Sequence, residues 1–176
     1  MLTSKAVFLD RDGTLIHDEN YIHHPSEVSL LPQTSEALQL LRAAGYQLFL
    51  FTNQSGVGRG MFPIESVYAC NDRMMELLGL GQNLFREICI APESPDQPVV
   101  YRKPSPRFLN ESIAKHQLER DACWMVGDKA IDAEAGLNAR IRAAVIRDAP
   151  LPNLPAVPHY LSLYAFAREL TTSSKR

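Results

Sequence analysis

The sequence predicts a three-layer α/β fold, with helices on both faces of a central, mainly parallel sheet. Short apolar runs alternate with longer amphipathic segments along the 176 residues. Runs that are short and continuously apolar are typical of strands buried on both faces of a parallel sheet. Polar clusters follow several of these runs directly, and in such sheets ligands bind beyond the carboxyl ends of the strands.

Five strands are expected from the apolar runs. The first covers residues 6–10 (AVFLD), which favour β structure. The others cover residues 47–52, 87–90, 124–126 and 143–146. Because helical patterns separate these runs, the strands are expected to pair in parallel through crossover connections.

Four helices are expected between the strands, over residues 35–44, 63–78, 104–118 and 129–138. The first places its apolar side chains on one stripe and ends at Gly45. Four prolines within residues 150–158 predict an extended connector to a last short strand and helix. The chain length favours a single domain over residues 1–176.

Composition narrows the possible partners. The formal net charge is −2 and no long run carries one sign, which argues against a nucleic-acid partner. No apolar stretch approaches the roughly 20 residues that span a bilayer, so no membrane partner is expected. The N-terminal residues MLTSKAVFLD do not resemble a signal peptide. We therefore expect a cytoplasmic protein, with a monomer favoured.

The first polar cluster is Asp10-Arg11-Asp12-Gly13-Thr14, directly after the first expected strand. Two carboxylates at a strand tip can bind a divalent cation and present one oxygen as a nucleophile. The same residues also fit a polar loop with an Asx-turn or a helix cap. The cluster alone leaves both readings open.

The second cluster is Thr52-Asn53-Gln54-Ser55-Gly56, directly after the second strand. Hydroxyl, amide and backbone N–H groups at a strand tip can hold phosphate oxygens, although they also suit an ordinary loop.

The third cluster is Arg102-Lys103-Pro104, at the expected start of a helix. There Lys103 and the helix N-terminus can neutralise a phosphoryl group, whereas the usual fate of a lysine is a solvated surface charge.

The fourth cluster runs from Gly127 to Asp132, directly after the fourth strand. Asp128 can complete the ligands of a cation, and Asp132 lies one helical turn further on, where it can orient Asp128 or Lys129. Each cluster is ambiguous alone. Together they predict one site that binds a cation and a phosphoryl group.

These residues resemble the motifs of the haloacid dehalogenase superfamily. The first motif is matched by Asp10 to Thr14, the second by Thr52, the third by Lys103 and the fourth by Gly127-Asp128-x-x-x-Asp132. A finer resemblance is to the D-glycero-D-manno-heptose bisphosphate phosphatases and histidinol-phosphate phosphatases. It is carried by Asp18-Glu19-Asn20-Tyr21, Pro25-Ser26-Glu27-Val28, residues 52–60 (TNQSGVGRG) and Arg102-Lys103-Pro104. The resemblance implies a Rossmann-like core, and the spacing between the clusters leaves no room for a separate cap domain.

The resemblance also implies a role for each site residue. Asp10 would be the nucleophile and Asp12 the general acid and base. Asn53 and Lys103 would steady the phosphoryl group. The other implied substrate contacts are Asp18, Glu19, Asn20, Tyr21, Thr52, Gln54, Ser55 and Arg102. Mg²⁺ would be held by the Asp10 side chain, the Asp12 backbone carbonyl and Asp128, with Asp132 in support.

The implied activity is magnesium-dependent hydrolysis of a small phosphorylated metabolite, such as D-glycero-D-manno-heptose 1,7-bisphosphate at its 7-phosphate. Histidinol phosphate, another sugar phosphate, a nucleotide or a polynucleotide end are alternative substrates. A different class of function, a non-catalytic metabolite-binding protein on the same fold, also stays open.

One departure from the resembled families concerns zinc. They usually carry a Cys/His zinc site in the loop before Arg102, yet residues 91–101 contain neither residue type. Cys89 alone cannot supply the four ligands of a structural site, so we predict no zinc. Because this loop is expected near the substrate, its change leaves the exact substrate open.

The cysteines and histidines are expected in roles other than metal binding. The three cysteines (Cys70, Cys89 and Cys123) are expected to be small apolar residues in a reducing compartment. His17, His23 and His24 are expected at the surface or near the substrate rather than on a hard cation such as Mg²⁺.

Overall fold

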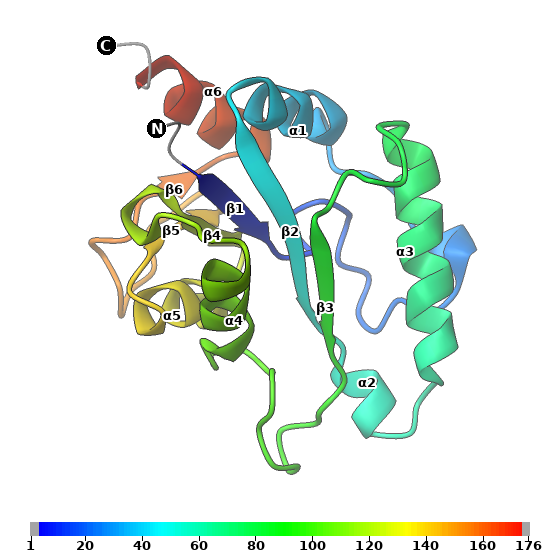
Figure 1. Cartoon of the computed structure of the whole chain (residues 1–176). Coiled ribbons are helices and arrows are strands. Elements are labelled where there is room, and N and C mark those ends of the chain that lie inside the picture. The colour runs from blue at the N-terminus through cyan, green and yellow to red at the C-terminus, as the bar shows by residue number, and fades with distance from the viewer. Residues whose placement is uncertain (1–3, 174–176) are drawn as a thin grey trace.

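The computed structural model describes residues 4–173, which fold around one six-stranded parallel sheet (Figure 1). The strand order is β3-β2-β1-β4-β5-β6. The strands are β1 (Lys5–Leu9), β2 (Tyr46–Asn53), β3 (Glu87–Ala91), β4 (Trp124–Gly127), β5 (Arg142–Ile146) and β6 (His159–Tyr160). The five expected strands are confirmed, and so is the short strand after the proline-rich segment.

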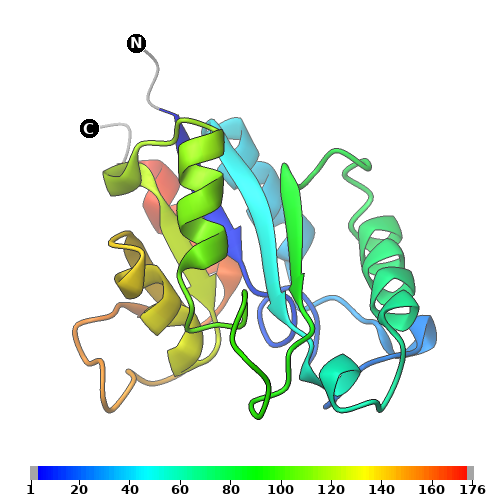
Figure 2. The same cartoon turned by 60° about the horizontal axis from the view of Figure 1, so that its bottom comes forward.

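Helices cover both faces of the sheet, which confirms the three-layer fold (Figure 2). One apolar cluster contains side chains of α1 (Thr34–Ala43), α3 (Ile64–Leu78) and α6 (Leu163–Ser173). The cluster on the other face contains side chains of α4 (Arg107–Lys115) and α5 (Ala130–Asn138). The shorter elements are α2 (Ser55–Gly58), η1 (Pro25–Glu27) and η2 (Arg120–Ala122).

Burial on both faces explains why the central strands are continuously apolar. In β1, Val7 and Leu9 join the cluster of α1, whereas Ala6 and Phe8 join that of α4 and α5. The Phe8 ring stacks on Phe49 of β2 with 4.6 Å between centroids. Each such aromatic side chain contributes about 1.5–3 kcal/mol by leaving water. These contacts fix β1 at the centre of the sheet, and the first polar cluster follows at its tip.

The order in which successive strands are added to the sheet reverses beside β1. This reversal brings the polar clusters together. After β3 at one edge, the chain crosses to β4 on the other side of β1. The amide of Asp10 donates to the carbonyl of Val126 at 2.9 Å, which joins the tips of β1 and β4. Ligands of open α/β sheets bind at such a reversal.

The local structure differs from the sequence-based expectations at two points. Residues 55–58 form the short helix α2, which was not among the four expected helices, with the amide of Arg59 donating to the carbonyl of Ser55. Helix α4 begins at Arg107 instead of residue 104, so Lys103 does not lie at a helix start. The physical reason is Pro106, because a residue before proline is disfavoured in the helical region.

Other expectations about the chain fit what is observed. The three cysteines are buried and unpaired, as expected of small apolar residues. Residues 150–158 contain no helix or strand, although Leu151 and Val157 are buried against β5. Among the helices within residues 4–173, none has both the length and the apolar character needed to cross a bilayer. The same residues show no separate folded unit between the polar clusters, in line with the absence of a cap.

Glu87, the first residue of β3, gives a pH prediction. Burial tends to raise the pKa of this carboxylate, but contacts from Lys115 and His116 outweigh burial and lower it. A lowered folded-state pKa stabilises the fold above the unfolded value of 4.5, and this contribution is lost as the pH falls through the folded-state pKa. We therefore expect Glu87→Gln to cost up to about 1 kcal/mol at pH 7 and less than that near pH 3.

Denaturant unfolding of the wild type and of Glu87→Gln at both pH values checks this expectation. Glu65→Gln, at an exposed position on α3, is the matched control. A difference between wild type and Glu87→Gln that did not change with pH would contradict it.

Candidate active site

A buried lysine joins two carboxylates at the tip of β1. The Nζ of Lys103 lies 2.7 Å from Oδ1 of Asp10 and 2.7 Å from Oδ1 of Asp132. It also donates to the carbonyl of Phe51 at 2.8 Å. Lys103 is only 2% exposed, so it is not a solvated surface charge. Since these residues come from four separate segments, the fold itself assembles the group.

Burial and ion pairing have opposite effects on the pKa values of Asp10 and Lys103. Burial raises the pKa of Asp10 to about 7, and Lys103 opposes that shift while Asp132 and Asp12 add to it. Burial tends to lower the pKa of Lys103, but the two carboxylates outweigh burial and raise it. Lys103 therefore stays charged at neutral pH. It favours the ionised form of Asp10.

Asp12 is held by side chains from its own loop and from the segment that ends β2 and follows it. Its two oxygens each accept a 3.0 Å hydrogen bond from the Arg11 guanidinium, and Gln54 Nε2 donates to Oδ2 at 2.9 Å. Arg11 is fully buried and also donates to Asn71 of α3 at 3.0 Å. Sequence reasoning did not single out Arg11 as a site residue. Its place between two aspartates was the available signal, but its burial depends on α3.

Three carboxylates form a potential cation site. Asp10, Asp128 and Asp132 each offer a ligand atom, and these atoms lie within 4.8 Å of one another. Oδ1 of Asp128 is buried and has no hydrogen-bond partner among the described residues. Burial raises the pKa of Asp128 to about 6 against the pull of Lys129. An unpartnered buried oxygen beside other carboxylates suits a hard divalent cation.

Two glycines allow the carboxylates to come this close to the backbone. A Cβ on Gly13 would lie 2.4 Å from Oδ2 of Asp128, and Gly13 has a φ of +79°. A Cβ on Gly127 would lie 2.2 Å from the carboxyl group of Asp132. Any side chain at either position would displace a carboxylate of the group.

A pocket of about 300 Å³ opens beside the carboxylates. Its lining includes eight of the residues predicted to bind substrate or take part in catalysis, together with three that were not predicted to do so. The eight are Asp12, Asp18, Asn20, Tyr21, Asn53, Gln54, Ser55 and Arg102, and the three are Ile22, Lys129 and Ile131. The loop after β1 and the loop before α4 therefore face one cavity.

Some predicted residues lie elsewhere or make unexpected contacts. Glu19 is exposed and does not line the pocket. Thr52 is buried and accepts a hydrogen bond from Gln54 Nε2 at 2.8 Å. Asn53 clamps the backbone of Lys103, because its Oδ1 accepts from the Lys103 amide and its Nδ2 donates to the Lys103 carbonyl. Asn53 thus positions Lys103 in addition to lining the pocket.

Lys129 is a pocket residue whose position the sequence did not predict. Its Nζ donates to Oδ2 of Asp18 at 2.8 Å, which links the start of α5 to the loop after β1. Only the tertiary fold brings these residues together, since 111 positions separate them in the chain.

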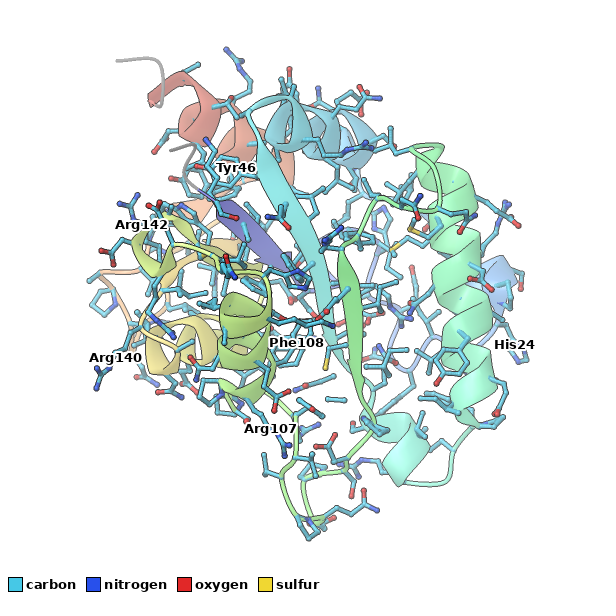
Figure 3. The ribbon with its side chains drawn as sticks, in the orientation of Figure 1. His24, Tyr46, Arg107, Phe108, Arg140 and Arg142 are labelled. Carbon is cyan, nitrogen blue, oxygen red and sulfur yellow. The ribbon has the colours of Figure 1, made fainter. Side chains whose placement is uncertain are left out.

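The three histidines do not lie with the carboxylates of Asp10, Asp128 and Asp132. His24 lies at the outer side of the molecule beside α3 (Figure 3). The ring of His23 stacks on Phe62 at 5.1 Å, and His17 is exposed. None of the three belongs to the carboxylate group found among the described residues.

Fold and site together define an α/β enzyme with an acidic centre and a paired lysine at the carboxyl edge of a parallel sheet. A family model of haloacid dehalogenase-like hydrolases matches residues 24–140. The chain belongs to this family, and the expected superfamily membership is confirmed.

Similarity to named relatives extends over most of the chain. D-glycero-D-manno-heptose-1,7-bisphosphate 7-phosphatase of Chlorobaculum tepidum is 34% identical over 84% of this chain and 80% of that protein. D-glycero-beta-D-manno-heptose-1,7-bisphosphate 7-phosphatase of Pasteurella multocida is 37% identical over 81% of this chain and 80% of that protein. The finer resemblance drawn from residues 18–28, 52–60 and 102–104 therefore agrees with similarity along most of the chain.

A solved structure supports the same relationship. The D,D-heptose 1,7-bisphosphate phosphatase from B. bronchiseptica, complexed with magnesium and phosphate, superposes with a TM-score of 0.86 at 26% identity. The alignment covers 96% of this chain and 99% of that one.

Proposed function

We propose that this chain is a magnesium-dependent phosphomonoesterase that hydrolyses a small phosphorylated metabolite through an aspartyl-phosphate at Asp10. The observation that carries the proposal is the buried pair of Asp10 and Lys103, 2.7 Å apart beside a polar pocket. A carboxylate nucleophile needs a neighbouring cation, because a phosphate monoester brings nearly two negative charges. Each pair of unit charges about 4 Å apart repels by about 4 kcal/mol at an effective dielectric near 20.

The residues present fit a magnesium ion. Asp10, Asp128 and the Asp12 backbone carbonyl would hold it, since all three offer hard oxygen ligands and Oδ1 of Asp128 lacks another partner among the described residues. When bound, Mg²⁺ would neutralise charge on the phosphoryl oxygens. Asp132 belongs to the same carboxylate group, but both of its oxygens have protein partners, Lys103 Nζ at 2.7 Å and the Lys129 amide at 3.0 Å, which favours a supporting role.

The protein residues would carry the two chemical steps. An oxygen of Asp10 attacks phosphorus, the bond from phosphorus to the substrate oxygen breaks, and Asp12 gives a proton to that oxygen. A water molecule then attacks the phosphorus of the aspartyl-phosphate while Asp12 takes its proton. The bond to Asp10 breaks and inorganic phosphate leaves. Lys103, whose Nζ lies 2.7 Å from Oδ1 of Asp10, offsets the charge of the incoming phosphoryl group.

For the substrate we propose D-glycero-D-manno-heptose 1,7-bisphosphate, cleaved at the 7-phosphate. The names of the relatives support this choice. The pocket also suits a second anionic group, because Arg102 and Lys129 both line it. Histidinol phosphate and other sugar phosphates or nucleotides remain the alternatives. A kinetic comparison of these compounds with Mg²⁺ tests the proposal, and the heptose bisphosphate is expected to have the highest kcat/KM.

Removal of the metal gives a direct prediction. We expect phosphate release from a generic aryl phosphate to stop in EDTA and to return when excess Mg²⁺ is added, because the carboxylates alone would repel the substrate. Colorimetric phosphate release after dialysis measures this. Undiminished turnover in EDTA would contradict the metal requirement. A protein that released no phosphate under any condition would instead favour a non-catalytic binding role.

We also propose that residues 1–176 form one domain, acting as a monomer in the cytoplasm without a membrane or nucleic-acid partner and without zinc. The one sheet of six strands formed within residues 4–173 supports the first part. Sedimentation and metal content measured on the purified protein test the oligomeric state and the absence of zinc.

A further inference from the structure

Glu93 holds the loop of residues 91–101 from within. Its side chain is buried, with the residue only 9% exposed, although most of the loop around it is exposed. Oε1 of Glu93 accepts hydrogen bonds from the amides of Val100, Tyr101 and Arg102, at 2.8, 2.6 and 3.2 Å. One carboxylate oxygen therefore gathers three successive backbone donors just before Lys103.

Arg102 also binds back to the backbone of Glu93. The guanidinium of Arg102 donates to the backbone carbonyl of Glu93 at 3.2 Å. The start of the loop is tied to α2, because the amide of Gly58 donates to the carbonyl of Pro92 at 2.9 Å. A Cβ on Gly58 would lie 2.6 Å from that same carbonyl oxygen, so loop and helix touch directly. The Glu93 end of the loop is thus fixed to α2. Through its hydrogen bonds, Glu93 in turn fixes Arg102.

Glu93 makes these contacts as a charged group. Burial tends to raise the pKa of its carboxyl group, but the backbone donors outweigh burial and lower it. Hydrogen bonds to an ionised acceptor are about twice as strong as those between neutral groups. A carboxylate is therefore better suited to this position than the isosteric amide of glutamine.

We propose that Glu93 is a positioning residue that fixes residues 100–102 and thereby directs the Arg102 side chain toward the substrate pocket. Arg102 lines that pocket, whereas Glu93 does not. Lys103 has its own restraints, since Asn53 clamps its backbone and Asp10 and Asp132 hold its ammonium group. Loss of Glu93 should therefore loosen Arg102 while leaving the reacting groups in place. The kinetic part of this inference rests on the proposed function.

Amide hydrogen exchange tests the structural part without any substrate. Glu93→Ala is expected to speed exchange at residues 100–102 at least about tenfold, because all three donors lose their acceptor. Glu93→Gln should restore part of the protection. Asp96→Ala removes an exposed carboxylate from the same loop and should change nothing. Unchanged exchange in Glu93→Ala would overturn the inference.

Steady-state kinetics with Mg²⁺ test the link to Arg102. For heptose 1,7-bisphosphate, Glu93→Ala should raise KM about tenfold with kcat within about twofold, which corresponds to about 1.4 kcal/mol of binding. Arg102→Ala should raise KM by a similar factor, and the double variant should be no worse than Arg102→Ala alone. Glu93→Gln should lie between wild type and Glu93→Ala.

Two kinetic outcomes overturn the inference. They are additive effects of Glu93→Ala and Arg102→Ala on KM, or a loss in kcat alone. If the wild type turned over no phosphate ester, the proposed function would fail. Amide exchange would then still decide whether Glu93 fixes residues 100–102.

Discussion

Asp10→Asn is expected to reduce phosphate release at least about 10³-fold, because the amide cannot form the acyl phosphate. The substitution keeps the shape of the side chain, and Lys103 keeps its 2.7 Å contact with Asp132. The fold should therefore survive. Turnover of an aryl phosphate, together with a thermal melt, separates loss of chemistry from loss of structure.

Two further variants sharpen the Asp10 prediction. Asp12→Asn should be nearly inactive as well, yet should still phosphorylate Asp10 slowly from a substrate with a good leaving group, because that step needs less help from an acid. Asp72→Asn, on the exposed side of α3, is the matched control and should behave as wild type. Wild-type turnover by Asp10→Asn would show that another group accepts the phosphoryl.

Lys103→Met should lower both stability and turnover. It removes the buried cation between Asp10 and Asp132, and Asp128 lies in the same group. Breaking a buried ion pair typically costs about 3–5 kcal/mol, because the remaining charge has no partner. Without Lys103 the phosphoryl group would also meet an uncompensated carboxylate, so we expect turnover to fall at least about 100-fold.

Urea unfolding in EDTA measures the stability change of Lys103→Met without a contribution from metal. Lys115→Met is the matched control, because Lys115 pairs with Glu87 at the surface and is 66% exposed. That control should cost no more than about 1 kcal/mol. Adding Asp132→Asn to Lys103→Met should recover part of the stability, since one uncompensated carboxylate is removed. Equal costs for the two lysines would contradict a special role for the buried one.

The strands and the polar clusters were predictable for a simple physical reason. Strands buried on both faces must be continuously apolar, so residues such as Phe8 and Phe49 mark them in the sequence. In a parallel sheet all carboxyl ends share one edge, so clusters that follow strands converge. That rule suffices to predict that Asp10, Asp12 and Asp128 lie in one region.

The contacts that orient these residues could not be predicted from the sequence. Arg11 reads as a charged loop residue, and only the packing of Asn71 on α3 shows that it is buried beside Asp12. The side chain of Asn53 has a phosphate-binding chemistry, yet it binds the Lys103 backbone. In both cases the two contacting residues are at least 50 positions apart in the chain. Patterns of neighbouring residues carry no information about such contacts.

The central claim is that Asp10 carries the phosphoryl group covalently. The most direct test is to mix Asp12→Asn with an aryl phosphate and Mg²⁺, quench the reaction, reduce it with borohydride and map the modified residue by mass spectrometry. Reduction converts an aspartyl-phosphate to homoserine. We expect homoserine at position 10 and nowhere else, whereas an unmodified Asp10 in protein that releases the aryl alcohol would contradict the claim.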